Sequence, residues 1–319
     1  MIATYSHIPV LAPRALELLA PALQMESPLL VDATLGLGGH TEMFLASIPA
    51  LQVLGIDRDP EALEQARERL TPFGDRVMFS QCRYDELASA LDEHAPGRAP
   101  GAILFDLGVS SLHLDKPERG FSYSHDAPLD MRMNPQDDVS AADILQSFTE
   151  ADLADLFHRL GDEKLAHRFA KAIVERRLQA PIVRTGDLVE VLQEATPYAL
   201  KDKGHPAKRV FQALRMAVNQ ELESLARALP IAFERVAVGG RVAIMSYHSG
   251  EDRLVKRELR KLSVSTAPPG LPTELPEHRP RFRELTRGAE MASAEEISLN
   301  PRSASVRLRA GEKVHEVHQ

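Results

Sequence analysis

Short apolar runs alternate with helical patterns along much of the chain. Five of these runs have the length of buried strands: 29–34, 52–57, 77–81, 101–106 and 240–247. Between the second and third runs, apolar residues recur at the spacing of one helix face: Ala62, Leu63, Ala66 and Leu70. Asp59 and Pro60 are typical of an N-cap and a first helical residue, so they predict where this helix begins. The alternation predicts an α/β fold with a parallel, doubly wound sheet.

The interval between the fourth and fifth strands is far longer than a crossover requires. A strand–helix–strand unit needs roughly 30 residues, whereas Asp106 and Arg241 lie 135 positions apart. We therefore expect a small all-helical domain at 125–204 that helps to dock the substrate. The sheet domain is then discontinuous and consists of 1–124 and 205–319.

The composition of the inserted segment is helical. Thr149 and Asp152 form a capping-box pattern ahead of an apolar stripe, and Gly161 can end that helix. A further helix, from Ala207 to about Ala228, is expected to return the chain to the sheet.

Two alternating segments close the chain, 281–287 and 303–309, and predict antiparallel strands. A helix over 251–262 precedes them, with acidic residues at its start and basic residues later, as the helix dipole favours. The expected sheet therefore has seven strands and ends in an antiparallel pair.

The stretch 29–40 carries the clearest candidate chemistry. Its apolar run ends at Asp32 and turns through Gly36, Gly38 and Gly39 into a helical segment. Such a loop points helix N–H groups at an anionic ligand and lets the backbone lie close to it. This acidic-then-glycine spacing resembles the first motif of S-adenosylmethionine (SAM) methyltransferases, whose usual sheet also has seven strands. A glycine-rich turn without a ligand is the alternative.

Asp57 is the candidate ribose ligand. It ends the second run about 20 residues past the loop, where an acidic side chain can accept hydrogen bonds from both ribose hydroxyls of an adenosine. Asp59 is better explained as a helix cap, and the sequence gives Asp57 no such structural role. A nicotinamide dinucleotide is disfavoured, because its G-x-G-x-x-G fingerprint needs a small residue at the position of Thr41.

Asp106 ends the fourth run and is the candidate catalytic residue. In open α/β sheets, ligands bind beyond the carboxyl ends of the strands, at the point where strand order reverses. That point lies between the first and fourth strands, so Asp106 should face the glycine loop. Asp106 or the Leu107 carbonyl could accept a hydrogen bond from an exocyclic base amine and make it more nucleophilic. A strand-end cap, or a cofactor contact alone, is the alternative.

The number and context of cysteines distinguish methylation of a base ring carbon from methylation of a nitrogen or oxygen. Methylating a ring carbon of a base generally needs a covalent cysteine adduct. The chain has one cysteine, Cys82, and its sequence context shows no sign of activation. Direct transfer to nitrogen or oxygen is therefore favoured, and we expect neither a disulfide framework nor a metal site.

Composition and charge indicate where the protein is located and which partners it can bind. The 319 residues are 44% hydrophobic, and no apolar run approaches the length of a membrane span. The first residues lack a basic-then-apolar signal pattern, so we expect a cytoplasmic protein. The net charge of −8 argues against polyanion binding by the whole surface. It leaves room for two local basic clusters: Lys201, Lys203, Lys208 and Arg209, and Lys256, Arg257, Arg260 and Lys261.

Several motifs together resemble the bacterial 16S rRNA (cytosine-N4)-methyltransferase family. They run in order along nearly the whole chain: Gly38-Gly39-His40, Ile56-Asp57-Arg58-Asp59-Pro60, Asp106-Leu107-Gly108-Val109-Ser110-Ser111, Glu118-Arg119-Gly120-Phe121-Ser122, Asp130-Met131-Arg132-Met133, His205-Pro206-Ala207, Phe211-Gln212-Ala213-Leu214-Arg215 and Ser246-Tyr247-His248-Ser249 with Glu251-Asp252-Arg253. The family commonly has Pro-Gln at Leu112-His113, and usually has Phe and Leu at Tyr247 and Gly250.

The resemblance implies methyl transfer from SAM to N4 of a cytosine in the decoding centre of 16S rRNA. Its partner would be the small ribosomal subunit and not a membrane, and a homodimer is compatible with it. The implied cofactor contacts are Gly38, Gly39, His40, Asp57, Tyr84, Asp106 and His113.

Residues 119–133 offer candidate RNA contacts. Phe121 or Tyr123 could stack on an extruded base, and Arg132 could hold a phosphate or a carboxylate. Buried packing and an ion pair with Asp130 are the structural alternatives. His248 could touch the substrate or orient the loop after the fifth strand.

Three other functions stay open at this level. They are a nicotinamide-dependent oxidoreductase, a ribosome-assembly factor without turnover, and a methyltransferase acting on DNA or a small molecule.

Overall fold

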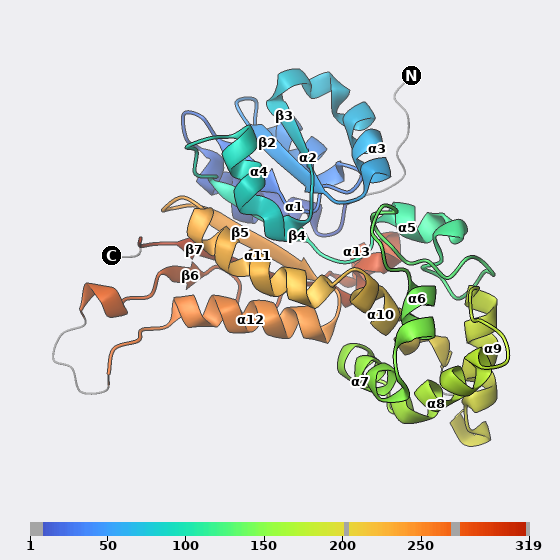
Figure 1. Ribbon diagram of the computed structural model, residues 1–319. Helices are drawn as coiled ribbons and strands as arrows, with labels where there is room; N and C mark the ends of the chain where they lie inside the picture. The colour runs from blue at the N-terminus through green and yellow to red at the C-terminus, as the bar shows by residue number, and fades with distance from the viewer. Residues whose placement is uncertain (1–8, 201–203, 269–274, 317–319) are drawn as a thin grey trace. The chain divides into compact units, whose positions relative to one another are not determined.

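The computed structural model describes residues 9–200, 204–268 and 275–316 (Figure 1). The chain divides into two units, a sheet unit of residues 1–108 and 223–319 and a helical unit of residues 109–222.

The sheet unit is built on one seven-stranded sheet, with the strand order β3-β2-β1-β4-β5-β7-β6. The strands are β1 (Leu29–Asp32), β2 (Gln52–Asp57), β3 (Val77–Gln81), β4 (Ala102–Asp106), β5 (Arg241–Ser246), β6 (Phe282–Glu284) and β7 (Arg307–Lys313). The first five pair in parallel, while β7 is antiparallel to both β5 and β6. The predicted α/β architecture is confirmed, including its terminal antiparallel pair.

Helices cover both faces of this sheet (Figure 1). One face carries α1 (Ala12–Leu19), α2 (Gly39–Ser47) and α3 (Pro60–Leu70), and the other carries α4 (Leu87–His94), α11 (Glu221–Arg235) and α12 (Ser249–Ser263). Because strand side chains alternate between faces, Leu104 packs in the first layer and Ile103 and Phe105 in the second. Burial on both faces explains why the parallel strands are continuous apolar runs.

The helix α3 begins and packs as its sequence predicts. The Asp59 carboxylate accepts a hydrogen bond from the Glu61 N–H, and Pro60 occupies the first turn. The buried residues of this helix are the predicted stripe: Ala62, Leu63, Ala66 and Leu70.

The helical unit has a hydrophobic core of its own. Its helices are α5 (Ser111–Asp115), α6 (Ala141–Ser147), α7 (Glu150–Gly161), α8 (Ala166–Arg177), α9 (Thr185–Ala195) and α10 (Ala207–Val218). Thr149 caps α7 through a reciprocal capping box with Asp152, as predicted, and α7 ends at Gly161. Phe157, Phe169 and Phe211 are buried together in this core.

The helical unit extends beyond the expected range of 125–204, to 109–222. On its N-terminal side, a Cβ at Gly120 would lie 2.2 Å from the Pro128 carbonyl oxygen, so these two segments are in direct contact. On its C-terminal side, Phe211 and Leu214 of α10 belong to the helical core. The expected boundaries are too narrow because local helical patterns do not reveal which core a flanking segment joins.

The expected single helix from Ala207 to Ala228 is wrong. It is two helices, α10 and α11, separated at Asn219 and Gln220, where Gln220 has a φ of 50°. The Asn219 side chain accepts a hydrogen bond from the Met133 N–H and donates one to the Met131 carbonyl. These tertiary bonds fix the break, although helical periodicity continues through it.

The last predicted strand is displaced along the chain. Residues 303–306 precede β7, and Pro301–Ser305 form a 3₁₀ turn after a short helix, α13 (Ala294–Leu299). In the part of the chain that the structure describes, no helix combines the length and the apolar character needed to cross a bilayer.

Candidate active site

Six of the seven implied cofactor residues lie in the sheet unit, at or just after the carboxyl ends of β1, β2, β3 and β4. They are Gly38, Gly39, His40, Asp57, Tyr84 and Asp106. The chain runs from β1 through β2 to β3 on one side of β1 and then returns to β4 on the other side, so the strand order reverses at β1. This is the position at which open α/β sheets bind their ligands.

The glycine loop between β1 and α2 has a conformation that side chains would oppose. Gly36 and Gly38 have φ values of 52° and 76°, in the region that glycine adopts most readily. A Cβ at Gly38 would lie 3.0 Å from Leu70 Cδ1, and one at Gly39 would lie 2.8 Å from Pro9 Cγ. The loop thus lies close to its own scaffold, and its N–H groups begin α2.

Asp57 has a structural role that the sequence did not indicate. One of its carboxylate oxygens accepts the Gly36 N–H at 2.7 Å, and the other accepts the Asp59 N–H at 2.9 Å. The expectation that Asp57 has no such role is therefore wrong. The first of these bonds links the end of β2 directly to the glycine loop, so Asp57 holds these two segments together.

Asp32, at the end of β1, is almost completely buried, with 1% of its surface exposed. It accepts the Thr41 hydroxyl at 2.7 Å and the Thr34 N–H at 3.3 Å. Burial raises the pKa of Asp32 from 3.8 to about 6, against the opposing effect of His40. Thr41, which counts against a dinucleotide fingerprint, thus anchors the start of α2 to the end of β1.

Asp106 lies at the centre of a group of polar side chains. Its Oδ1 accepts the Tyr247 hydroxyl at 2.6 Å, and its Oδ2 lies 3.4 Å from Nε2 of the buried His40. Its backbone N–H donates to the Thr34 hydroxyl at 2.6 Å. Burial and the Asp106 charge together raise the pKa of Tyr247, so the phenol stays protonated and donates. Asp106 and His40 were candidates from the sequence, which did not indicate that Tyr247 contacts Asp106.

Tyr84 and Cys82 lie near the same edge of the sheet, just after β3. Tyr84 packs edge-on against Phe105 of β4, with ring centroids 5.9 Å apart, so part of its ring belongs to the core. The Cys82 thiol lies 3.4 Å from the Ser80 hydroxyl, and burial raises its pKa. A raised pKa disfavours the thiolate, which is the form that attacks a base carbon.

A family model and the curated relatives point to one family. A model described as the MraW methylase family matches residues 4–314. The chain belongs to the MraW methylase family. Among curated relatives, a Clavibacter michiganensis protein named ribosomal RNA small subunit methyltransferase H is 57% identical over 312 residues, covering 98% of each chain.

Two more relatives carry the same name. One, from Leifsonia xyli, is 57% identical and covers 96% of this chain and 94% of its own. The other, from Mycobacterium marinum, is 55% identical, and the alignment covers 97% of this chain and 80% of the relative. Among solved structures, an rRNA methylase from Streptococcus thermophilus aligns over 97% of this chain and 99% of its own, at 15% identity and a TM-score of 0.44. The resemblance inferred from the motifs is confirmed.

The seventh implied cofactor residue of this MraW-family chain, His113, belongs to the helical unit. Its Nδ1 accepts the Ser110 N–H at 3.2 Å, as part of the cap of α5, and its ring stacks on Phe121 at 4.8 Å. His113 and Phe121 are both buried.

The other candidate RNA contacts also have structural partners. Tyr123 stacks on His205, with centroids 4.5 Å apart. Arg132 makes a two-pronged ion pair with Asp130, at 2.9 and 2.6 Å. His248 caps α12, where its Nδ1 accepts the Gly250 and Glu251 N–H groups. The ion pair of Arg132 with Asp130 and the role of His248 in orienting the loop after β5 are the structural alternatives that the sequence left open.

Proposed function

We propose that this protein methylates the exocyclic N4 of a cytosine in the decoding centre of 16S rRNA by direct transfer from SAM. Membership of the MraW methylase family and the shared name of its curated relatives support a small-subunit rRNA methyltransferase. The arrangement of Asp106, held between Tyr247 and His40 beside the glycine loop, supports an amine as the acceptor.

The residues at the strand ends fit SAM. We assign the glycine loop to the methionine portion, which its backbone can approach closely, and Asp57 at the end of β2 to the ribose hydroxyls; the bond between Asp57 and the Gly36 N–H supports this assignment. An ionised carboxylate has about four acceptor positions, so a carboxylate that accepts backbone N–H groups can also accept hydrogen bonds from ribose hydroxyls. Tyr84 and His113 are proposed further cofactor contacts. When bound, SAM supplies a methyl group activated by its sulfonium charge.

Asp106 handles the proton in this scheme. Tyr247 engages Oδ1, and we assign Oδ2 to accept the hydrogen bond from the N4 amine. That bond directs the nitrogen lone pair toward the methyl carbon. With SAM bound, its sulfonium would supply the methyl group and keep the electron pair of the broken S–C bond, and Asp106 Oδ2 would accept the proton that N4 loses. Cys82 takes no part, because its raised pKa disfavours a nucleophilic thiolate.

The helical unit is the proposed docking element for the RNA. It is a separately packed unit inserted between β4 and β5, and the exposed Lys208 and Arg209 lie on its α10. Lys201 and Lys203 of the same basic cluster lie outside the described residues. A ribosomal substrate places the reaction in the cytoplasm.

Labelled SAM and purified small subunits test this function. Wild-type protein should transfer label to 16S rRNA, and Asp106→Asn should lower kcat by about 10²–10⁴, the usual contribution of a positioned base. SAM affinity, measured by calorimetry, separates this loss from a binding defect. An assembly factor without turnover would leave the RNA unlabelled, and full activity in Asp106→Asn would reject the assigned base.

A further inference from the structure

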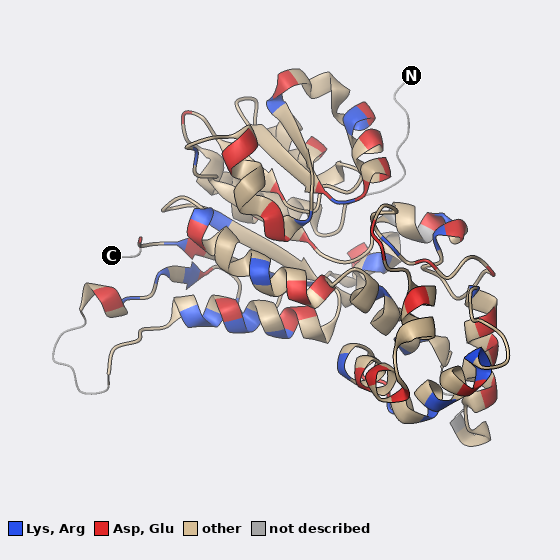
Figure 2. Ribbon diagram, viewed as in Figure 1, with Lys and Arg blue, Asp and Glu red and all other residues tan. Residues whose placement is uncertain are grey.

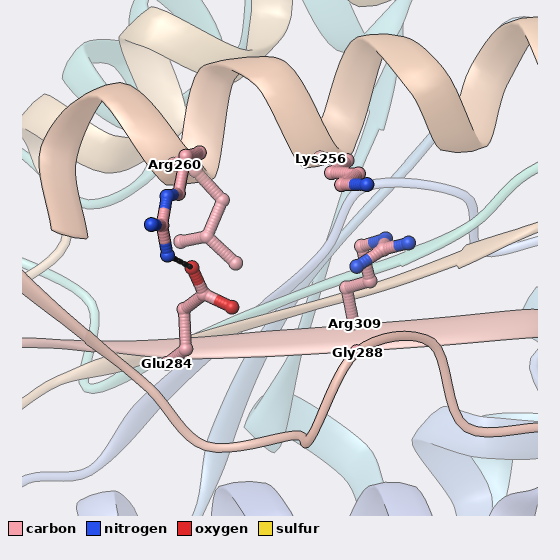
Figure 3. A pocket seen from close by; sticks show the side chains of 6 residues that line it. Lys256, Arg260, Glu284, Gly288 and Arg309 are labelled. Carbon is pink, nitrogen blue, oxygen red and sulfur yellow. Dashed lines mark ion pairs between the residues drawn. The ribbon is translucent and has the colours of Figure 1, made fainter. Parts of the chain in front are cut away.

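The sheet unit has a second polar site, apart from the strand ends that carry Asp106. It is a cavity of about 350 Å³ between α12 and the terminal strands β6 and β7. Its lining residues are Lys256, Leu259, Arg260, Glu284, Gly288 and Arg309. In Figure 3, Lys256 and Arg260 extend from α12 toward Glu284 and Arg309 on the strands.

Positive charge exceeds negative charge around this cavity. The buried Arg309 is fixed by Asp252 at 2.7 Å, and Arg307 contacts the same carboxylate at 3.2 Å. Burial alone would raise the pKa of Asp252, but these two guanidinium groups hold it below its ordinary value. One carboxylate thus serves two cations, and the local charge stays positive.

The remaining pair across the cavity is loose. Arg260 lies 3.9 Å from Glu284, near the limit for an ion pair, and both side chains are partly exposed. Lys256 is exposed, and within the described ranges it forms no ion pair. An arrangement of this kind has donors available at the cavity without a rearrangement of the core.

The cavity continues into a basic helix surface. Arg253, Lys256, Arg257, Arg260 and Lys261 are exposed on α12, whose basic residues are blue in Figure 2. Glu258 is engaged by Arg257 and Lys261. From Arg253 to Arg260 the helix rises about 10 Å at 1.5 Å per residue. Cations spread over that length favour binding of an extended polyanion over binding of a single small anion. They form a local basic surface on a protein whose net charge is −8.

We propose that the cavity under α12 holds a backbone phosphate of the substrate RNA, with Lys256 and Arg260 as its ligands and the rest of α12 following the strand. The inference rests on the proposed function, because the RNA is taken to be the rRNA substrate. Arg260 supplies a planar fork suited to phosphate oxygens, and Lys256 supplies a mobile point charge. The contact is independent of base sequence, so it contributes affinity and register while the active site selects the base.

The test compares charge changes at the cavity with equal changes elsewhere. Lys256→Ala and Lys256→Glu are paired with Arg67→Ala and Arg67→Glu. Arg67 is exposed on α3, which connects β2 and β3 at the other edge of the sheet. Full-length proteins are titrated with purified small subunits at salt concentrations between about 50 and 200 mM, the range in which phosphate contacts change affinity most visibly.

Lys256→Ala should weaken subunit binding about fivefold at 0.1 M salt and lower the salt slope by about 0.7, the value for one lost phosphate contact on a single strand. Lys256→Glu should weaken it further. Both Lys256 variants should keep the SAM affinity and the melting temperature of the wild type. Both Arg67 variants should bind small subunits with wild-type affinity. Lys256 variants that match the Arg67 variants would overturn the cavity assignment. A wild type that neither binds nor methylates small subunits would instead reject the proposed function, and the inference with it.

Discussion

Asp57→Asn is the substitution that tests cofactor binding most sharply. It keeps the size of the side chain and removes its charge. In the structure, the two carboxylate oxygens accept the N–H groups of Gly36 and Asp59. Asparagine has one acceptor oxygen and an NH₂ group that can only donate. One of the two backbone N–H groups must therefore face another donor, and the glycine loop loses part of its support.

The expected magnitude follows from the ribose hydrogen bonds. Hydrogen bonds to a charged group contribute about 1.5–3 kcal/mol, which corresponds to a loss of SAM affinity of roughly one to two decades. Isothermal calorimetry measures this directly. Adenosine and 2′-deoxyadenosine sharpen the result, because a variant that has lost the ribose bond should discriminate less between them than the wild type does.

Asp59→Asn is the matched control, two residues away. Asp59 caps α3 through the Glu61 N–H, and asparagine is about as good an N-cap as aspartate. Its SAM affinity should equal that of the wild type. If Asp57→Asn also binds SAM with wild-type affinity, the ribose assignment is refuted.

Three further outcomes are expected. Because folding raises the pKa of Asp32 from 3.8 to about 6, the free energy of unfolding of the wild type should fall as pH rises through that window. The loss is at most about 3 kcal/mol, at 1.36 kcal/mol per pKa unit. Denaturant unfolding of Asp32→Asn should not show this loss, and equal pH profiles for the two proteins would contradict the titration of a buried Asp32. Gly38→Ala should lose about 1–2 kcal/mol of stability and weaken SAM binding, whereas Gly74→Ala, with a similar φ of 57° and open space around its Cβ, should lose stability only. Cys82→Ser should retain the wild-type kcat on small subunits, and an inactive serine variant would point to covalent chemistry at a base carbon.

Local patterns in the sequence predicted the elements that local physics determines. The strands were recognisable because burial on both faces makes each one a short apolar run, and α3 was recognisable from its cap and its stripe. The glycine loop and Asp57 were placed at adjacent strand ends because parallel strands finish at one edge of a sheet. These are properties of spacing and side-chain type.

Features that depend on tertiary contacts were not predictable in this way. The break at Gln220 is fixed by Asn219, which bonds to residues 86 and 88 positions away. The contact between Tyr247, just after β5, and Asp106, at the end of β4, joins residues 141 positions apart. The unit boundaries at Gly108 and Glu223 likewise depend on which core each flanking segment packs into. A single sequence carries no local signal for such pairings.

Mass mapping of 16S rRNA would identify the nucleotide and the atom that this protein methylates. Small subunits from cells lacking this protein would be compared before and after incubation with the purified chain and SAM. We predict one added methyl group on N4 of a decoding-centre cytidine, absent beforehand and restored by the wild type. A methyl group on a ring carbon, on another nucleoside, or on no RNA at all would contradict it.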